Sequence, residues 1–250
     1  MRALMIGLMV AAGWTTAASG QAGSTTDDGA FFDDRASHNQ ESEEDRKLGE
    51  LLIKGAKLSM SGRQSEAIFM YFDRVASVYE ARYKDKNVDY FCARHMAEQL
   101  FYLVHRANSG TKRPAVMAPI NWALSYYLKA HALVDLGRPS EAKAPLERAL
   151  ALAPQNALFL SERGYLYQMQ KDWPASLETY KQAEAAAQQF SPNETRNTEL
   201  ARAWRGQAYT LIETNHLSEA EALYRKCLDL DPNDAKAKRE LQYIAQLRRR

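Results

Sequence analysis

One phrase of sequence occurs twice in this chain, and the repetition constrains the fold more than any other feature. Residues 137–156 read GRPSEAKAPLERALALAPQN, and residues 215–234 read NHLSEAEALYRKCLDLDPND. Both segments contain Ser-Glu-Ala, an alanine two residues later, and the pattern Leu-x-Leu-x-Pro in the same order. Self-similarity of this kind indicates a chain built from stacked units, none of which buries its apolar face alone.

Small residues recur at two positions of each unit. The spacing predicts two antiparallel helices joined by a tight turn at Gly137 or Asn215, residue types that tolerate left-handed backbone. Only small side chains let two helix backbones approach closely, so we expect the two small residues of a unit to face each other where its helices cross. These pairs are Ala130 with Ala142, Gly164 with Ser176, and Ala208 with Ala220.

The pattern resembles the tetratricopeptide repeat, a helix–turn–helix unit of about 34 residues. The resemblance covers residues 48–81 and 123–234. It implies an all-α fold, a right-handed superhelical solenoid of about four to five antiparallel helix pairs followed by a C-terminal capping helix.

The repeats and the composition together divide the chain. We expect a signal peptide (1–20), an acidic disordered tail (21–46), an N-terminal helical region (47–122), a repeat array (123–234) and a basic capping helix (235–250). The array divides into repeats at 123–156, 157–190 and 201–234, and the N-terminal region into one repeat at 48–81 and an irregular helical pair. Residues 87–107 are predicted to form one long helix of that pair, and residues 190–199 an inserted loop.

The start of the chain has the pattern of a secretory signal. Met1 and Arg2 precede the apolar run ALMIGLMVAAGW, and small residues follow it. The run is shorter than the ~20 residues that span a bilayer, which disfavours the alternative of an uncleaved anchor. We therefore expect export to the periplasm, or otherwise secretion, and a processed protein that is not integral to the membrane.

Opposite charges gather toward the two ends of the chain. Residues 21–46 contain eight acidic residues and two arginines, whereas residues 236–250 contain six basic residues and one acidic residue. The acidic segment has the composition of a disordered tail. The basic segment is typical of the polar helix that caps a solenoid, and in an exported protein it does not indicate binding to nucleic acid.

No catalytic motif is apparent. The chain lacks a His-Glu-x-x-His pattern, a phosphate-binding glycine loop and a nucleophile elbow, so we expect neither an enzyme nor a cofactor. One alternative is a metal-binding protein or enzyme built around residues 88–121, where Cys92 and His95 would meet on the predicted helix and His105 follows. Cys92 and Cys227 belong to distant parts of a stacked array, so we expect two free, buried thiols.

The resemblance also implies where a partner binds. In tetratricopeptide-repeat proteins the first helices of successive units line a concave groove that holds an extended peptide or a partner helix. We therefore expect a scaffold or assembly factor of the cell envelope that binds a protein or peptide, and a self-associating structural subunit (a homo-oligomer) is a further alternative. Carried over to this sequence, the groove residues are Tyr127, His131, Ser161, Tyr165, Gln168, Arg202, Arg205 and Tyr209.

Overall fold

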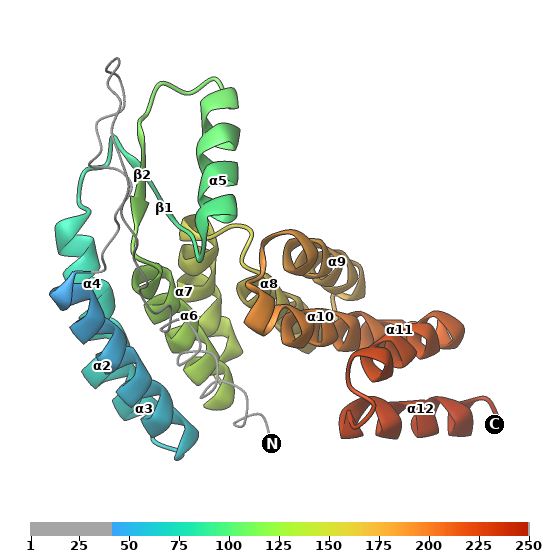
Figure 1. The fold of residues 1–250 in the computed structure, drawn as a ribbon. Coiled ribbons are helices and arrows are strands. Elements are labelled where there is room, and N and C mark those ends of the chain that lie inside the picture. Colours follow the sequence, from blue (N-terminus) through green and yellow to red (C-terminus); the bar gives the residue numbers. More distant parts are fainter. Residues whose placement is uncertain (1–41, 250) are drawn as a thin grey trace, which may run out of the picture.

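The computed structural model describes residues 42–249, and its helices stack side by side in chain order (Figure 1). The fold is a solenoid of antiparallel helix pairs, which confirms the predicted fold class. The predicted signal peptide and nearly all of the acidic tail lie outside the described residues. The pairs are α2 (Glu43–Met60) with the run α3 (Gln64–Ala67), η1 (Ile68–Phe72) and α4 (Asp73–Arg82); α6 (Ile120–Asp135) with α7 (Pro139–Leu152); α8 (Ala157–Met169) with α9 (Trp173–Phe190); and α10 (Asn193–Glu213) with α11 (Leu217–Leu230), followed by α12 (Ala235–Leu247).

The small residues of the repeat lie in the interior, at the positions where the sequence places them. Ala130 and Ala142 have no exposed surface, and neither do Ala208 and Ala220. Between α8 and α9, the hydroxyl of Ser176 donates a hydrogen bond to the backbone carbonyl oxygen of Gly164 at 3.1 Å. A side chain reaches the backbone of the facing helix in this way only where the two helices pack closely.

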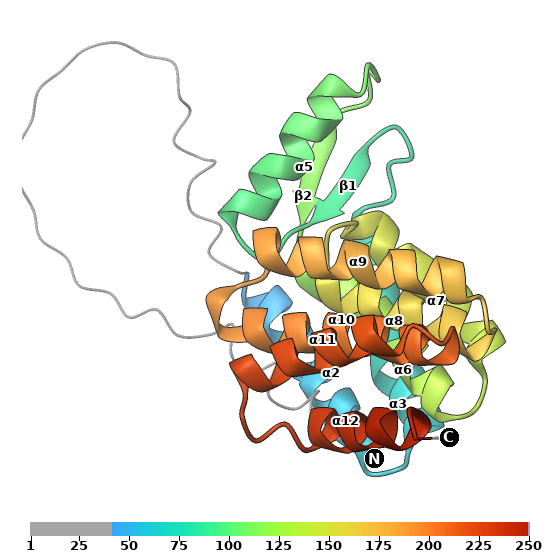
Figure 2. The same ribbon diagram turned by 90° about the vertical axis from the view of Figure 1, so that its right-hand side faces the viewer.

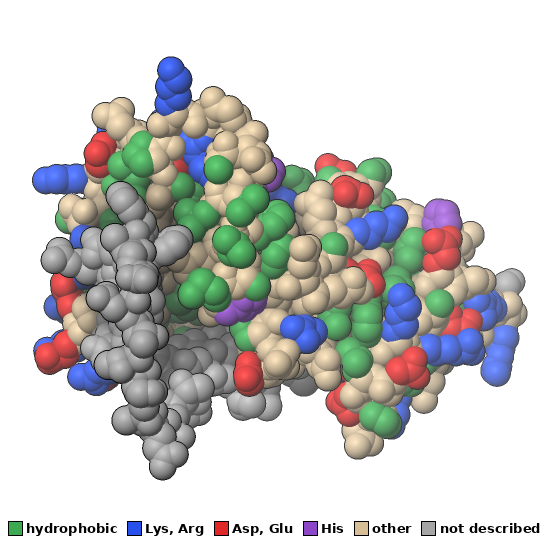
Figure 3. All heavy atoms as spheres, turned by 45° about the horizontal axis from the view of Figure 1, so that its top comes forward, with side chains coloured by type: hydrophobic (Ala, Val, Ile, Leu, Met, Phe, Trp, Pro, Cys, Tyr) green, Lys and Arg blue, Asp and Glu red, His purple; other side chains and the backbone are tan. Residues whose placement is uncertain are grey.

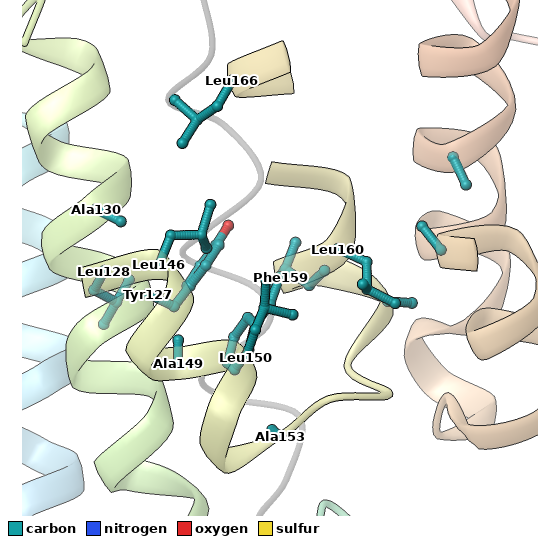
Figure 4. Close-up of a cluster of buried hydrophobic side chains, with 14 of the residues drawn as sticks. Tyr127, Leu128, Ala130, Leu146, Ala149, Leu150, Ala153, Phe159, Leu160 and Leu166 are labelled. Atoms are coloured by element: carbon teal, nitrogen blue, oxygen red, sulfur yellow. The ribbon is translucent and has the colours of Figure 1, made fainter. Parts of the chain in front are cut away.

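Large apolar side chains fill the space between neighbouring pairs. Figure 4 shows this packing between α6, α7 and α8, with Tyr127, Leu146 and Phe159 directed toward one another. The rings of Tyr127 and Phe159 stack with their centroids 4.9 Å apart. The apolar face of one pair is therefore covered by the next pair, as a solenoid requires.

The turns within the pairs use left-handed backbone. Gly137, between α6 and α7, has a φ of 73°, and Asn215, between α10 and α11, has a φ of 63°. The repeat pattern assigns tight turns to both of these residues and to Gly62, which has a φ of 88°. Glycine and asparagine are among the few residue types that adopt this conformation at low cost.

A strand–helix–strand unit interrupts the solenoid between α4 and α6. The strands β1 (Asp89–Cys92) and β2 (Ala115–Ala118) pair in parallel, with Asp89 opposite Ala115, and α5 (Met96–Asn108) connects them. In Figure 2 this unit, which we call the insertion, stands out from the stacked helices. The sequence predicted one long helix across residues 87–107 and an irregular helical pair, and that prediction is wrong.

The correction follows from the packing of β1. Tyr90 lies against Trp122 of the solenoid, with ring centroids 5.8 Å apart, whereas Phe91 lies against Tyr102 of α5 at 5.5 Å. Successive side chains thus enter two different apolar environments on opposite faces, and only extended backbone allows this.

One face of α5 remains exposed. Met96, Leu100 and Val104 recur every four residues along the helix and are 71%, 59% and 50% exposed. Figure 3, in which the top of Figure 1 comes forward, shows hydrophobic side chains gathered on this part of the surface.

None of the helices in residues 42–249 is both long and apolar enough to cross a membrane.

A second correction concerns residues 190–199, which the sequence assigned to an inserted loop. Instead, α9 ends at Phe190 and α10 begins at Asn193. Pro192 occupies the N-cap of α10, and its carbonyl oxygen accepts the backbone N–H groups of Thr195 and Arg196 at 3.0 and 2.8 Å. A proline before the first helical turn has no N–H that the helix needs, so here it marks the start of a helix rather than a loop.

Candidate functional site on the inner face of the repeat array

The first helices of three successive pairs contribute one ionisable side chain each to a connected row. Glu162 of α8 lies between His131 of α6 and Arg202 of α10. The Nδ1 atom of His131 is 3.2 Å from one carboxylate oxygen of Glu162, and the Nη2 atom of Arg202 donates to the other oxygen at 2.5 Å. We call His131, Glu162 and Arg202 the inner-face row.

His131 and Glu162 of this row are buried, and Arg202 is partly buried. Glu162 is only 1% exposed, and a carboxylate in such a place needs a cationic or hydrogen-bonding partner to remain ionised. Burial by itself lowers the pKa of Arg202, but the neighbouring Tyr127 and Glu162 outweigh this effect and raise it above its usual range. Arg202 therefore stays charged whenever the protein is folded and compensates Glu162.

The eight residues predicted to line a groove fall into three groups. Tyr127, His131 and Ser161 are buried in the core of the array. Three others are partly buried and bonded within the protein: Arg202 to Glu162; Gln168 to the carbonyl oxygen of Gly206 at 2.9 Å; and Arg205 to Asp234, before α12, at 2.6 Å. Tyr165 is half-buried and Tyr209 is exposed.

Tyr209 is the most exposed of the eight, whereas Tyr165 packs against the hydrophobic core. Burial and the neighbouring Glu213 raise the pKa of Tyr209, so its hydroxyl stays protonated and can donate a hydrogen bond at neutral pH. Tyrosine offers a rigid ring and a polar tip, which makes it a frequent anchor at protein interfaces. The inner face thus combines the inner-face row with the exposed ring of Tyr209.

Glu162 is the functional candidate that sequence reasoning missed. It follows Ser161 directly, but an isolated acidic residue on a helix is ordinarily exposed. Only the approach of α6 and α10 on either side of α8 shows that it joins two repeats. The signal in the sequence was weak, because Glu162 is a single acidic residue next to the assigned groove position Ser161.

The residues of the metal-site alternative lie in separate surroundings. The Cys92 thiol donates to the carbonyl oxygen of Pro119 at 3.3 Å, His95 caps α5 and bonds to the carbonyl oxygen of Phe190, and the ring of His105 stacks on Phe101. Across residues 42–249, no three His, Cys, Asp or Glu side chains are grouped so as to hold a metal ion.

Both cysteines are free and buried, as predicted. Burial raises the pKa of the Cys92 thiol to about 12 and that of the Cys227 thiol to about 11. The thiolate is the form that binds metals and acts as a nucleophile, so neither residue is poised for such chemistry at neutral pH.

Comparison with known families agrees with the repeat that the sequence suggested. Residues 127–192 match one family model described as tetratricopeptide repeat, and residues 201–234 match a second. Both segments match the tetratricopeptide repeat. The first match runs from within α6 to the end of α9, and the second covers α10 and α11, so the inner-face row lies entirely within the matched repeats.

Two further comparisons concern whole chains. No curated protein matches the sequence. Among solved structures, the chain is similar to one described as the crystal structure of the APC/C hetero-tetramer Cut9–Hcn1, with 16% sequence identity and a TM-score of 0.47. The likeness covers 81% of this chain and 37% of the other, so this chain spans well under half the length of that protein.

Proposed function

We propose that this protein is a protein–protein interaction scaffold or assembly factor, and that the inner face of α6, α8 and α10 holds a peptide segment or a partner helix. The matched tetratricopeptide repeats support the general class, because stacked repeats of this kind create extended concave binding surfaces. The exposed Tyr209 and the inner-face row support the location of the binding surface on that face.

The observation that carries the proposal is the bridge formed by Glu162. Its two carboxylate oxygens contact His131 from the preceding pair and Arg202 from the following pair. The three first helices therefore present one continuous, rigid face rather than three independent ones. A preorganised face loses little conformational entropy when a partner binds.

We further propose that the protein acts in the cell envelope. This part of the proposal rests on the signal-like pattern of residues 1–20, which lie outside the described residues. The protein would then meet its partner in the periplasm or, if secreted, outside the cell.

Site-specific photo-crosslinking in cells tests the proposed face. A photoreactive phenylalanine analogue is placed at Tyr209 or Tyr165, and at Phe69 as the matched control. Phe69 belongs to η1, far from the inner-face row along the chain, and is 80% exposed. The two inner positions should yield adducts with the same discrete protein, and Phe69 should not.

The pattern of adducts decides the proposal. Adducts at Phe69 equal to those at Tyr209, or none at either inner position, would contradict a binding role for the inner face. Fractionation of the adducts between periplasm and cytoplasm then tests the envelope location separately, because binding and location can fail independently.

A further inference from the structure

A second concave site lies at the junction of the insertion and the solenoid. It is a cleft of about 610 Å³ bounded by the end of α4, the chain leading into β1, β1 itself and α7. The cleft forms because β1 crosses beside α7, where an uninterrupted array would have no strand. It shares no residue with the inner-face row and opens between different elements.

One wall of the cleft is aromatic and rigid. Tyr83, Tyr90 and Trp122 pack against one another, with ring centroids 5.2–5.8 Å apart. The Trp122 side chain is only 1% exposed, so the surrounding core fixes the ring that forms this wall.

The charges around this wall are unequally compensated. Three acids line the cleft: Asp89 is paired with Arg106 and Arg113, Glu80 accepts the Tyr126 hydroxyl, and Asp85 accepts the backbone N–H of Asn87. Four cations line it as well, namely Lys84, Lys86, Arg113 and Arg148, so the cations outnumber the acids. Of these cations, Lys84, Lys86 and Arg148 form no ion pair within residues 42–249, although all three are exposed. The cleft therefore offers cationic groups to a negatively charged ligand.

Arg148 connects the charge to the aromatic wall. Its guanidinium carbon lies 5.4 Å from the centroid of the Trp122 ring, a cation–π contact that holds the group in place. A planar guanidinium binds a carboxylate through two parallel hydrogen bonds, and prior orientation reduces the entropy lost in doing so.

We propose that this cleft binds an acidic peptide segment of a partner protein, with an aromatic side chain against Tyr83 and Tyr90 and carboxylates on Arg148 and the two lysines. Charge complementarity selects an anionic ligand, and the aromatic wall favours one that also carries a ring. The protein would then have two separate surfaces for protein segments, and this second one does not depend on the inner face.

Titration of the full chain with synthetic peptides tests the proposal. The probe is the acetylated peptide Glu-Phe-Glu-Glu-Phe-Glu, compared with Glu-Ala-Glu-Glu-Ala-Glu and Lys-Phe-Lys-Lys-Phe-Lys. Binding is followed by NMR through the indole N–H signal of Trp122, assigned with Trp122→Phe, and by calorimetry. The acidic aromatic peptide should shift this signal and bind more tightly than both others, with an affinity that falls as salt rises.

Charge-reversing variants locate the site. Arg148→Glu, and separately the double variant Lys84→Glu with Lys86→Glu, should each weaken binding about tenfold or more, since each removes a cation and adds a repelling charge. Lys143→Glu is the matched control, because Lys143 is an exposed cation on the same helix as Arg148 that does not line the cleft. It should leave the affinity unchanged within about twofold.

Several results would overturn the proposal. These are equal affinity for the acidic and basic peptides, no loss of affinity in either cleft variant, or shifts confined to residues of α8 and α10. Displacement of the peptide by inorganic phosphate at similar concentration would show a general anion site instead. Preferential binding to anionic phospholipid vesicles, lost in the same variants, would show a membrane surface as the occupant.

Discussion

The ring of Tyr180 packs directly against the backbone of Gly206, so that a Cβ atom at Gly206 would lie 2.2 Å from two of its ring atoms. On its other side the same ring borders Gly164, where an added Cβ would lie 2.9 Å away. Tyr180 of α9 thus fills a slot between α8 and α10 that exists only because both helices carry glycine there. The slot joins two repeats through one side chain.

The first prediction concerns this slot. Gly206→Ala should destabilise the protein by about 1–3 kcal/mol, because the ring has no room to move toward Gly164. Chemical unfolding at constant pH measures the effect. In the Tyr180→Ala variant no ring faces position 206. Gly206→Ala should therefore cost less in that variant than it does in the wild type. Strict additivity would show that the two residues are not in contact.

A second prediction concerns the attachment of the insertion to the array. Arg94, between β1 and α5, donates to Glu199 of α10 at 2.7 Å, and Glu199 is 1% exposed. Glu199→Ala removes the closer carboxylate partner of Arg94 and leaves only Glu98, at 3.6 Å. Loss of one partner of a buried ion pair costs up to about 3–5 kcal/mol, and the remaining contact with Glu98 should keep the cost at or below the lower end of that range. Hydrogen exchange should accelerate in α5, although α5 is distant from Glu199 in sequence.

The matched control is Glu194→Ala, which removes an exposed acid from the same helix. It should leave exchange in α5 unchanged. If Glu199→Ala accelerated exchange only within α10, the insertion would be held by other contacts and the predicted coupling would be wrong.

How much of this fold the sequence predicts depends on the range of the interactions. The crossing residues were predictable because each sits at a fixed place within its own unit, and Ala130, Ala142 and Ala208 are indeed fully buried. The strands were not predictable, because each has only four residues and its pairing partner lies beyond a whole helix. So short a run shows no clear alternation of polar and apolar residues.

The site was predictable to a lesser degree. The repeat pattern predicts which side of a first helix faces inward, and Tyr209, one of the residues it assigned there, is exposed on α10. It does not specify how closely the next pair approaches, and this distance decides that Tyr127 and Ser161 are buried. The contacts of Glu162 depend on both neighbouring pairs at once, so no single repeat contains the information.

A third prediction concerns stability in acid. Burial alone would raise the pKa of Asp45, but hydrogen bonds from Ser42, Arg82 and Tyr79 outweigh burial and lower it. A carboxyl whose pKa is lower in the folded than in the unfolded state stabilises the fold above the unfolded pKa of about 3.9, and this contribution is lost as the pH falls through the folded pKa. Stability should therefore fall in acid below about pH 5.

Asp45→Asn should remove part of that dependence. The free energy of unfolding of the variant should be lower at pH 7 and should change less between pH 5 and pH 2 than that of the wild type, as measured by urea unfolding across this range. Asp229→Asn changes an exposed aspartate on α11 and serves as the control. Parallel pH profiles for wild type and Asp45→Asn would refute the contribution of Asp45.

The most direct test of the account compares two identical substitutions on α7. Ala142 is fully buried where α7 meets α6, whereas Ala144, two residues later, is exposed. If small side chains at the crossing are what allow the pairs to stack, Ala142→Leu should lower the free energy of unfolding by about 1–3 kcal/mol, and Ala144→Leu should change it by less than about 0.5 kcal/mol. Equal unfolding free energies for the two variants would contradict the account.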